Sequence, residues 1–180
     1  MLQLTIPKSE AYDERTNTFI TLENDCTLLL EHSLYSISKW EEHWEKPFLT
    51  TDNKTTEESI DYIRCMTIND VDPAVYFFLG PEAFAAIDKY IARQMTATTI
   101  RDMHARRRGR EIITSEIIYY LMFSYNIPIE CEKWHLNKLI TLIQVFNVKN
   151  SPPKKMSKSE ALRQQRSLNE ARKAKWHTKG

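Results

Sequence analysis

The longest apolar run of the chain lies in the segment SEIIYYLMFSY, residues 115–125. On a helical wheel its apolar residues occupy every side, a pattern typical of a helix that is surrounded by protein. We therefore predict that this helix is the central element of the fold. The run from Ile117 to Phe123 is far shorter than the roughly 20 residues needed to cross a bilayer, so no membrane span is expected.

A second helix is expected directly after this segment. Asn126, Ile127 and Pro128 break the first helix, because proline has no amide hydrogen to donate in a helix interior. Residues 130–147 then resume a helical pattern, with a broad apolar arc and a polar arc opposite it. We predict that the two helices pack as an antiparallel hairpin at the centre of the fold.

Shorter elements are predicted on the N-terminal side of the apolar segment. Two β-branched segments, residues 95–100 and 111–114, favour a β-hairpin around an arginine-rich loop. The capping box of Thr55 with Glu58 indicates a helix over about residues 56–66. A further helix is predicted to begin at Pro81, since proline is favoured at the first helical position.

The N-terminal region combines strand-like segments with one short helix. The strand-like segments are residues 2–6, 18–22 and 26–31. Bounded by Asn, Asp and Pro, they are expected to form a small β-meander or hairpin. Ser38 and Glu41 have the capping-box spacing, so we predict a short helix that carries Trp40 and Trp44 on one side.

Two consecutive prolines, Pro152 and Pro153, end the regular pattern of the main body. Residues 1–150 are therefore predicted to form one α+β domain, in which the β-meander or hairpin packs on a mainly helical body. Residues 151–180 are predicted to form an extended basic tail with a helical stretch reaching about Lys173. Because this stretch has few apolar residues, we expect it to be frayed or extended when no partner is bound.

Charge is distributed unevenly along the chain. Residues 1–80 contain 15 Asp and Glu against 6 Lys and Arg, whereas residues 81–180 contain 9 against 19. The formal net charge of +1 hides this asymmetry. A basic tail on an acidic front half indicates a partner that the tail contacts, either an acidic protein surface or nucleic acid.

The candidate partner-binding residues lie in the arginine-rich loop and in the tail. They are Arg106, Arg107, Arg108, Arg110, Lys154, Lys155, Arg163, Arg166, Arg172 and Lys173. Clustered cationic groups can bind phosphates or carboxylates. No aromatic residue lies between Met95 and Glu111 to stack on bases, so we interpret the loop as an electrostatic contact rather than one that reads bases. For the tail we favour an acidic protein partner over nucleic acid, because of the family resemblance given below. The acidic front half of another copy is a further candidate, which would mean self-association.

No catalytic or metal-binding motif emerges from the residues. Cys131 and His135 lie four residues apart on a predicted helix, but two ligands do not complete a zinc site. The acidic residues around His43, Glu41 among them, are interpreted as the wet face of an amphipathic helix. We therefore predict no enzymatic activity, no cofactor and no metal. The three widely spaced cysteines are interpreted as core residues in a reducing compartment.

Six blocks of sequence, spread over most of residues 28–175, carry a resemblance to a known family. The blocks are LEHSLYSISKWE at residues 30–41, DYIRCMT at 61–67, MTATT at 95–99, REIITSEIIYY at 110–120, KWHLN at 133–137 and PPKKMS at 152–157. Taken together they resemble the tail-morphogenesis proteins of tailed bacteriophages, which are often called tail assembly chaperones.

The resemblance implies a nonenzymatic protein in the cytoplasm of an infected bacterium. Such a protein keeps a tail protein soluble until it polymerises. The resemblance names the tape measure as the expected client and the major tail protein as a second candidate, and it implies no cofactor. Two alternatives stay open: a structural component of the virion, such as a connector or tail completion protein, and a nucleic-acid-binding accessory protein.

Overall fold

The computed structural model describes residues 1–14, 17–51, 53–98, 112–150 and 158–176, and these residues form an α+β fold. The chain divides into two compact units, Met1–Asn147 and Val148–Gly180. The first unit contains all the described strands, and every described helix before the last one begins in it. The second contains the long helix α6, Lys158–Trp176. We describe each unit by itself.

The four strands of the first unit form two stretches of one long β-hairpin. They are β1 Leu2–Ile6, β2 Ser9–Asp13, β3 Thr18–Leu22 and β4 Cys26–Leu30. Strand β1 pairs antiparallel with β4, and β2 pairs antiparallel with β3. The pairing is therefore nested, and it confirms the hairpin rather than the meander. Strand β2 was not among the predicted strands.

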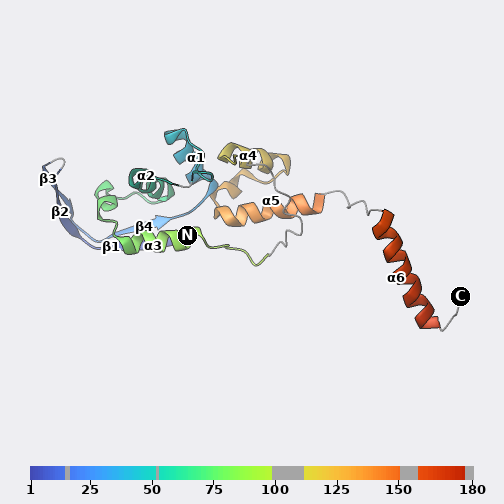
Figure 1. The fold of residues 1–180 in the computed structure, drawn as a ribbon. Helices are drawn as coiled ribbons and strands as arrows, with labels where there is room; N and C mark the ends of the chain where they lie inside the picture. Colours follow the sequence, from blue (N-terminus) through green and yellow to red (C-terminus); the bar gives the residue numbers. More distant parts are fainter. Residues whose placement is uncertain (15–16, 52, 99–111, 151–157, 177–180) are drawn as a thin grey trace. The chain divides into compact units, whose positions relative to one another are not determined.

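The hairpin is interrupted between its two stretches. Pro7, which has no amide hydrogen to donate to a ladder, follows β1 directly. The next amide, that of Lys8, donates to the Asp25 carboxylate at 2.9 Å instead of to a strand. On the opposite side Glu23, Asn24 and Asp25 span the same gap, one residue more than the two on the first side. Such an extra residue bends a hairpin, as Figure 1 shows for β2 and β3.

Two helices follow the hairpin in the chain, and the second of them contacts β4. Helix α1 spans Leu34–Trp44 and helix α2 spans Thr56–Met66. The predicted capping box of α2 is confirmed, because Thr55 and Glu58 bond each other's backbone amides. The predicted start of α1 is wrong. Its N-cap is Ser33, whose hydroxyl accepts from the amide of Ser36, so α1 begins before the predicted Ser38.

The remaining elements of the first unit follow in order. They are η1 Pro73–Phe78, α3 Pro81–Ile91, α4 Ser115–Ser124, η2 Ile129–Lys133 and α5 Leu136–Asn150, which continues past the end of the first unit at Asn147. The start of α3 at Pro81 is confirmed. None of these described helices, nor any other in the described ranges, is long and apolar enough to cross a membrane.

Two predictions in this region need correction. The pattern over residues 130–147 is not one helix, because η2 and α5 are separated at His135, where the amide of Leu136 donates to the carbonyl of His32 at 2.7 Å. The predicted hairpin of residues 95–100 and 111–114 is not a hairpin where it is described: residues 95–98 and 112–114 contain no strand. Its other residues, 99–111, lie outside the described part of the chain.

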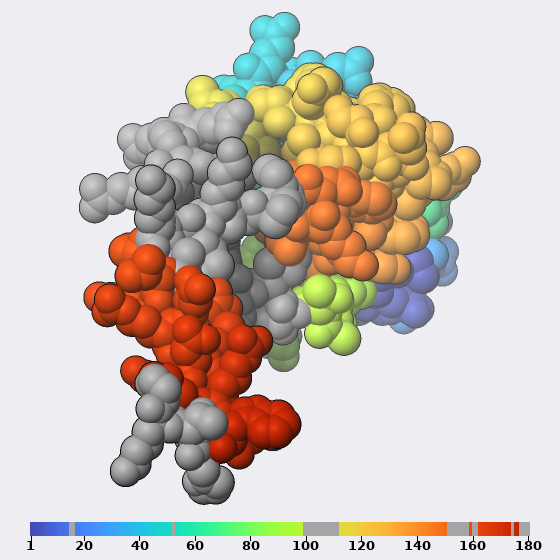
Figure 2. Space-filling model, turned by 90° about the vertical axis from the view of Figure 1, so that its right-hand side faces the viewer, coloured from blue at the N-terminus to red at the C-terminus, as the bar shows by residue number. Residues whose placement is uncertain are grey.

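The hydrophobic core is centred on α1 and β4. Trp40, Leu34, Ile37, Leu28 and Leu30 are completely buried. Helix α1 packs against α2, α4 and η2, so it occupies the place that we predicted for residues 115–125. Helix α4 is a helix as predicted, but it is not enclosed by protein. Its end meets α5 through the stacked rings of Tyr125 and Phe146, and Figure 2 shows α4 in yellow beside α5 in orange.

Candidate partner-binding surface

The first turn of α4 is held by a buried carboxylate from α1. The Glu41 side chain accepts from the amide of Ser115 at 2.7 Å and from the amide of Phe48 at 2.8 Å. Thr114, the N-cap residue, makes no side-chain cap bond, so Glu41 supplies the acceptor that α4 lacks locally. A negative group at a helix N-terminus is also favoured by the helix dipole. Glu41 therefore fixes where α4 begins and which way it faces.

Helix α4 buries only one narrow side. Ser115, Ile118 and Met122 point inward, at the helical spacing of three and four residues. On the outer side, 69% of Tyr120 and 62% of Phe123 are exposed. The segment that the sequence predicts to be enclosed thus exposes two of its three central aromatic residues.

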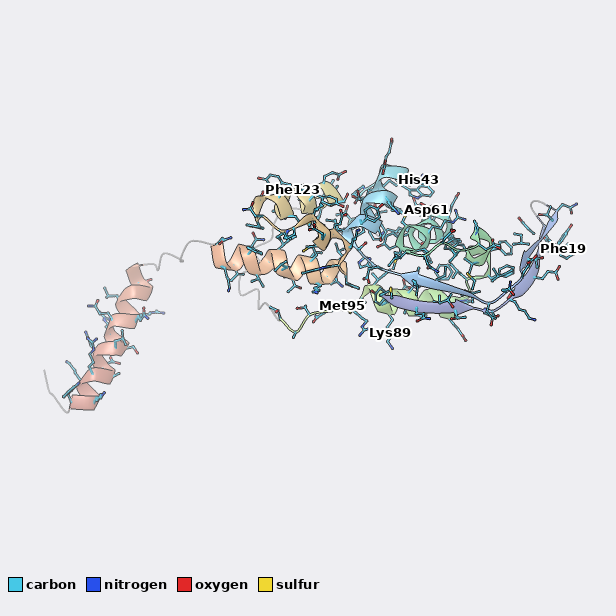
Figure 3. All side chains as sticks on the ribbon, turned by 180° about the vertical axis from the view of Figure 1, so that it is seen from behind. Phe19, His43, Asp61, Lys89, Met95 and Phe123 are labelled. Atoms are coloured by element: carbon cyan, nitrogen blue, oxygen red, sulfur yellow. The ribbon has the colours of Figure 1, made fainter. Side chains whose placement is uncertain are left out.

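The outer side of α4 presents a continuous aromatic surface. The ring of Tyr119 stacks on that of Phe123, with centroids 6.5 Å apart and planes 22° apart. The Tyr119 hydroxyl donates to the Glu132 carboxylate of η2 at 2.7 Å, which fixes the ring. We call Tyr119, Tyr120 and Phe123 the aromatic face. Figure 3 labels Phe123 on α4, far from Phe19 on the β2–β3 hairpin.

The surroundings of the aromatic face add both apolar surface and charge. Ile112 and Ile113, just before α4, are exposed. Tyr35 on α1 is exposed as well, and the Lys39 ammonium lies 4.5 Å from its ring centroid. The Thr114 hydroxyl, by hydrogen bonding, lowers the pKa of Glu116, so that carboxylate is ionised at neutral pH. An apolar surface with a charged rim is the usual composition of a protein-binding site.

The predicted basic residues are only partly described. Arg163, Arg166, Arg172 and Lys173 are exposed on α6. The other predicted binding residues lie outside the described residues: Arg106, Arg107, Arg108, Arg110, Lys154 and Lys155. The aromatic face was not predicted as a binding surface. Its signal was present in the sequence, because a helix that is apolar all round buries every side only if neighbours exist to cover them.

The acidic residues around His43 do not form a single wet face. Glu42, His43 and Glu45 are exposed, as interpreted from the sequence, but Glu41 is buried. The interpretation was therefore wrong for Glu41, because amphipathic spacing does not reveal that two backbone amides of other segments require a buried acceptor. The Glu41 carboxylate instead links α1 by hydrogen bonds to the backbone at Phe48 and to the start of α4.

The buried histidines belong to a hydrogen-bonded network of the core. His32 Nδ1 lies 2.5 Å from the Tyr62 hydroxyl, and the rings of His32 and His135 are 5.2 Å apart. His135 Nε2 lies 3.2 Å from the carbonyl oxygen of Tyr90. Burial, and to a smaller extent His135, lowers the pKa of His32 to about 3. Burial also lowers the pKa of His135.

A metal site at Cys131 and His135 finds no geometric support. Within the described ranges no group of three or more His, Cys, Asp or Glu residues is placed to hold an ion. Burial raises the pKa of the Cys131 thiol. Cys131 and His135 lie in the core beside the network of His32.

No protein-family model matches the chain, and no curated protein and no solved structure matches it either. The geometry of the surfaces described above, together with the sequence blocks, is therefore the basis for a functional proposal.

Proposed function

We propose that this protein is a nonenzymatic binding protein of phage tail assembly, which holds a tail protein in solution until it polymerises. The tape measure is the proposed client, and the aromatic face of α4 is the proposed contact. The resemblance of the sequence blocks supplies the tail-assembly context, and the structure supplies the surface.

One observation carries the proposal. The most apolar segment of the chain leaves Tyr120 and Phe123 outside the core, although most other elements of the first unit bury apolar residues in it. Exposing large aromatic side chains to water costs free energy of hydration that burial against a partner would recover. A long helical client with an apolar stripe offers a matching surface in the helix-in-groove or helix-on-helix manner.

A chaperone must also release its client. Two exposed aromatic residues and a charged rim give a contact of limited size, and small interfaces of this kind are weak and reversible. Tyr119 is already bonded to Glu132, so the client would meet a preorganised ring rather than a mobile one. We expect binding without rearrangement of α4.

Co-expression with the tape measure of the same phage tests the proposal. The wild-type chain is expected to keep the tape measure in the supernatant and to co-purify with it. The double variant Tyr120→Ser with Phe123→Ser is expected to lose both effects. Phe19→Ser is the matched control, because Phe19 is 69% exposed on the β2–β3 hairpin and lies off the aromatic face.

Two results would count against the proposal. The first is a soluble tape measure that never co-purifies with the wild-type chain. The second is equal co-purification with the wild-type chain and with the α4 double variant, which would move the contact elsewhere. Mass spectrometry of purified particles separates this function from that of a virion component, since an assembly chaperone is expected to be absent from them.

A second candidate function rests on α6. This helix contains six basic and two acidic residues, and Arg163, Arg166 and Arg172 are exposed. Such a helix can contact successive phosphates, so a nucleic-acid-binding accessory protein is the alternative proposal. Its signature is an affinity that falls steeply as salt rises; a flat salt dependence removes it.

A further inference from the structure

A long open groove crosses the surface of the first unit beside α2. Its main part, of about 800 Å³, lies between the end of α1, the helix α2, the β2–β3 hairpin and η1. Apolar side chains of these elements line it, with Trp44, Ile60 and Phe77 among them. Phe77 is 48% exposed. The groove is thus an apolar surface that the chain's own described residues leave uncovered.

Two smaller hollows continue the groove along η1. One, of about 440 Å³, shares Arg64, Pro73 and Tyr76 with the main part. The other hollow, of about 420 Å³, shares Asn69 and Asp70 with the hollow of about 440 Å³. Neighbouring hollows share lining residues, so the three adjoin one another along this surface. We call the three hollows together the acidic groove.

The rim of the acidic groove is strongly negative. Its carboxylates are Asp13, Glu23, Asp25, Glu57, Asp61, Asp70 and Asp72. Among its described lining residues Arg64 is the single Lys or Arg, and its guanidinium carbon lies 5.2 Å from the Tyr76 ring centroid. The excess of negative charge therefore repels phosphate and favours a cationic occupant.

Helix α6 has the complementary composition. Leu162, Leu168 and Trp176 are its large apolar residues, and each is more than half exposed. At 3.6 residues per turn these three fall within about one third of the helix circumference. Basic residues outnumber acidic ones six to two along the same helix. A helix of 19 residues is roughly 28 Å long, which suits an elongated groove better than a round pocket.

We propose that the acidic groove of one copy binds α6 of a second copy. The apolar arc of α6 covers the apolar floor, and its basic residues face the carboxylates of the rim. Such helix-in-groove binding uses a few apolar anchors, while charge selects the partner and its orientation. The contact joins different surfaces of the two copies, so it is head-to-tail and propagates into rings or chains.

This inference is independent of the proposed client. The acidic groove is built from α1, α2, η1 and the β-hairpin, and none of its lining residues belongs to the aromatic face of α4. Self-association through the acidic groove therefore leaves the aromatic face available. A failure of the co-purification experiment would not affect it.

Sedimentation velocity of the full chain tests the proposal. The wild-type protein is expected to associate reversibly, and the association is expected to weaken as salt rises from about 50 mM to about 500 mM, because screening shortens the reach of the charges. Reversing the groove charges with Glu57→Lys and Asp70→Lys is expected to lower the association constant about tenfold or more. Reversing the helix charges with Arg163→Glu, Arg166→Glu and Arg172→Glu is expected to act alike.

A matched control separates the groove from net charge. Glu82→Lys with Asp88→Lys changes the charge by the same amount on α3, and Glu82 occupies the first turn of α3 as Glu57 occupies that of α2. This control is expected to associate like the wild type. Equal losses in the control and in the groove variant would overturn the proposal, since net charge alone would then explain both.

Mixing the two reversed proteins gives the sharpest outcome. Each alone is expected to associate weakly, because the two lysines remove much of the negative charge of the groove in one variant and the three glutamates leave α6 with more acidic than basic residues in the other. Mixed together they are expected to form a complex, since the intact groove of one then meets the intact α6 of the other. A wild-type chain that stays monomeric at low salt overturns the proposal, as does a mixture of the reversed proteins that forms no complex.

Discussion

Helices α1 and α4 are both rich in aromatic residues, yet the largest aromatic side chain of α1 is buried and two of the three aromatic side chains of α4 are mostly exposed. Trp40 of α1 is completely buried, and its indole donates to the carbonyl of Glu58 at 2.9 Å. On α4, Tyr120 and Phe123 are mostly exposed. The difference follows from neighbours: α1 packs against α2, α4 and η2, whereas α4 has one packed side. Apolar content therefore says what a helix can bury, and the surrounding elements decide what it does bury.

Replacing Trp40, the buried aromatic residue of α1, is expected to destabilise the fold most. Trp40→Ala removes a large side chain from the centre of the core and leaves a cavity, so we expect a loss of about 3–5 kcal/mol in the free energy of unfolding. Urea unfolding followed by circular dichroism measures it. A loss below about 1 kcal/mol would mean that α1 is not the centre of the core.

The link between the two helices gives the next effect. In the wild type, each of the two Glu41 carboxylate oxygens accepts one amide, that of Phe48 or that of Ser115. Glu41→Gln keeps the size of the side chain but leaves one oxygen for these two amides. One buried amide then lacks an acceptor, and we expect a loss of about 2–3 kcal/mol. Glu42→Gln on the same helix is the control, since Glu42 is exposed and should change stability little.

The buried histidine network is expected to make the stability of the fold depend on pH. The folded chain holds the pKa of His32 at about 3, while in the unfolded chain it takes the ordinary value of 6.5. Below 6.5 the unfolded state therefore binds a proton that the folded state refuses, so stability falls as the pH drops from 6.5 toward 3. At pH 5 the expected loss is about 2 kcal/mol relative to neutral pH.

Urea unfolding at several pH values measures this loss. His32→Gln is expected to make the fall in unfolding free energy between pH 7 and pH 5 shallower, because glutamine binds no proton in the unfolded state. An unchanged slope for His32→Gln would remove His32 from the account.

The smallest expected effect lies on the aromatic face. Tyr120→Ser with Phe123→Ser removes side chains that are already in water, so we expect the unfolding free energy to change by less than about 1 kcal/mol in total. The same urea measurement checks this. A loss comparable to that of Trp40→Ala would show that the aromatic face is part of the core, and the contrast between α1 and α4 would fail.

Much of the local structure could be predicted, because its signals are local. The capping box of Thr55 with Glu58 and the proline at Pro81 mark helix starts directly. Strand β2 could not be predicted in the same way, since Ser9–Asp13 has little strand propensity. It becomes a strand because it pairs with β3, residue Ser9 opposite Leu22.

The candidate surface was harder to predict than the elements. Periodicity identifies α4 as a helix, but apolar residues on every side give no indication of which side stays outside. The buried role of Glu41 likewise depends on Ser115, which is 74 residues away in sequence. Charge asymmetry predicts a partner, but it could not locate the acidic groove, which forms only when α1, α2, η1 and the β-hairpin come together.

The most direct test of the central claim is site-specific cross-linking to the tape measure during co-expression. A photo-reactive phenylalanine analogue is placed at Phe123 in one chain and at Phe19 in another, since both side chains are largely exposed. We predict a cross-link to the tape measure from position 123 and none from position 19. Cross-linking from position 19 alone, or from neither position while the tape measure co-purifies, would contradict the account.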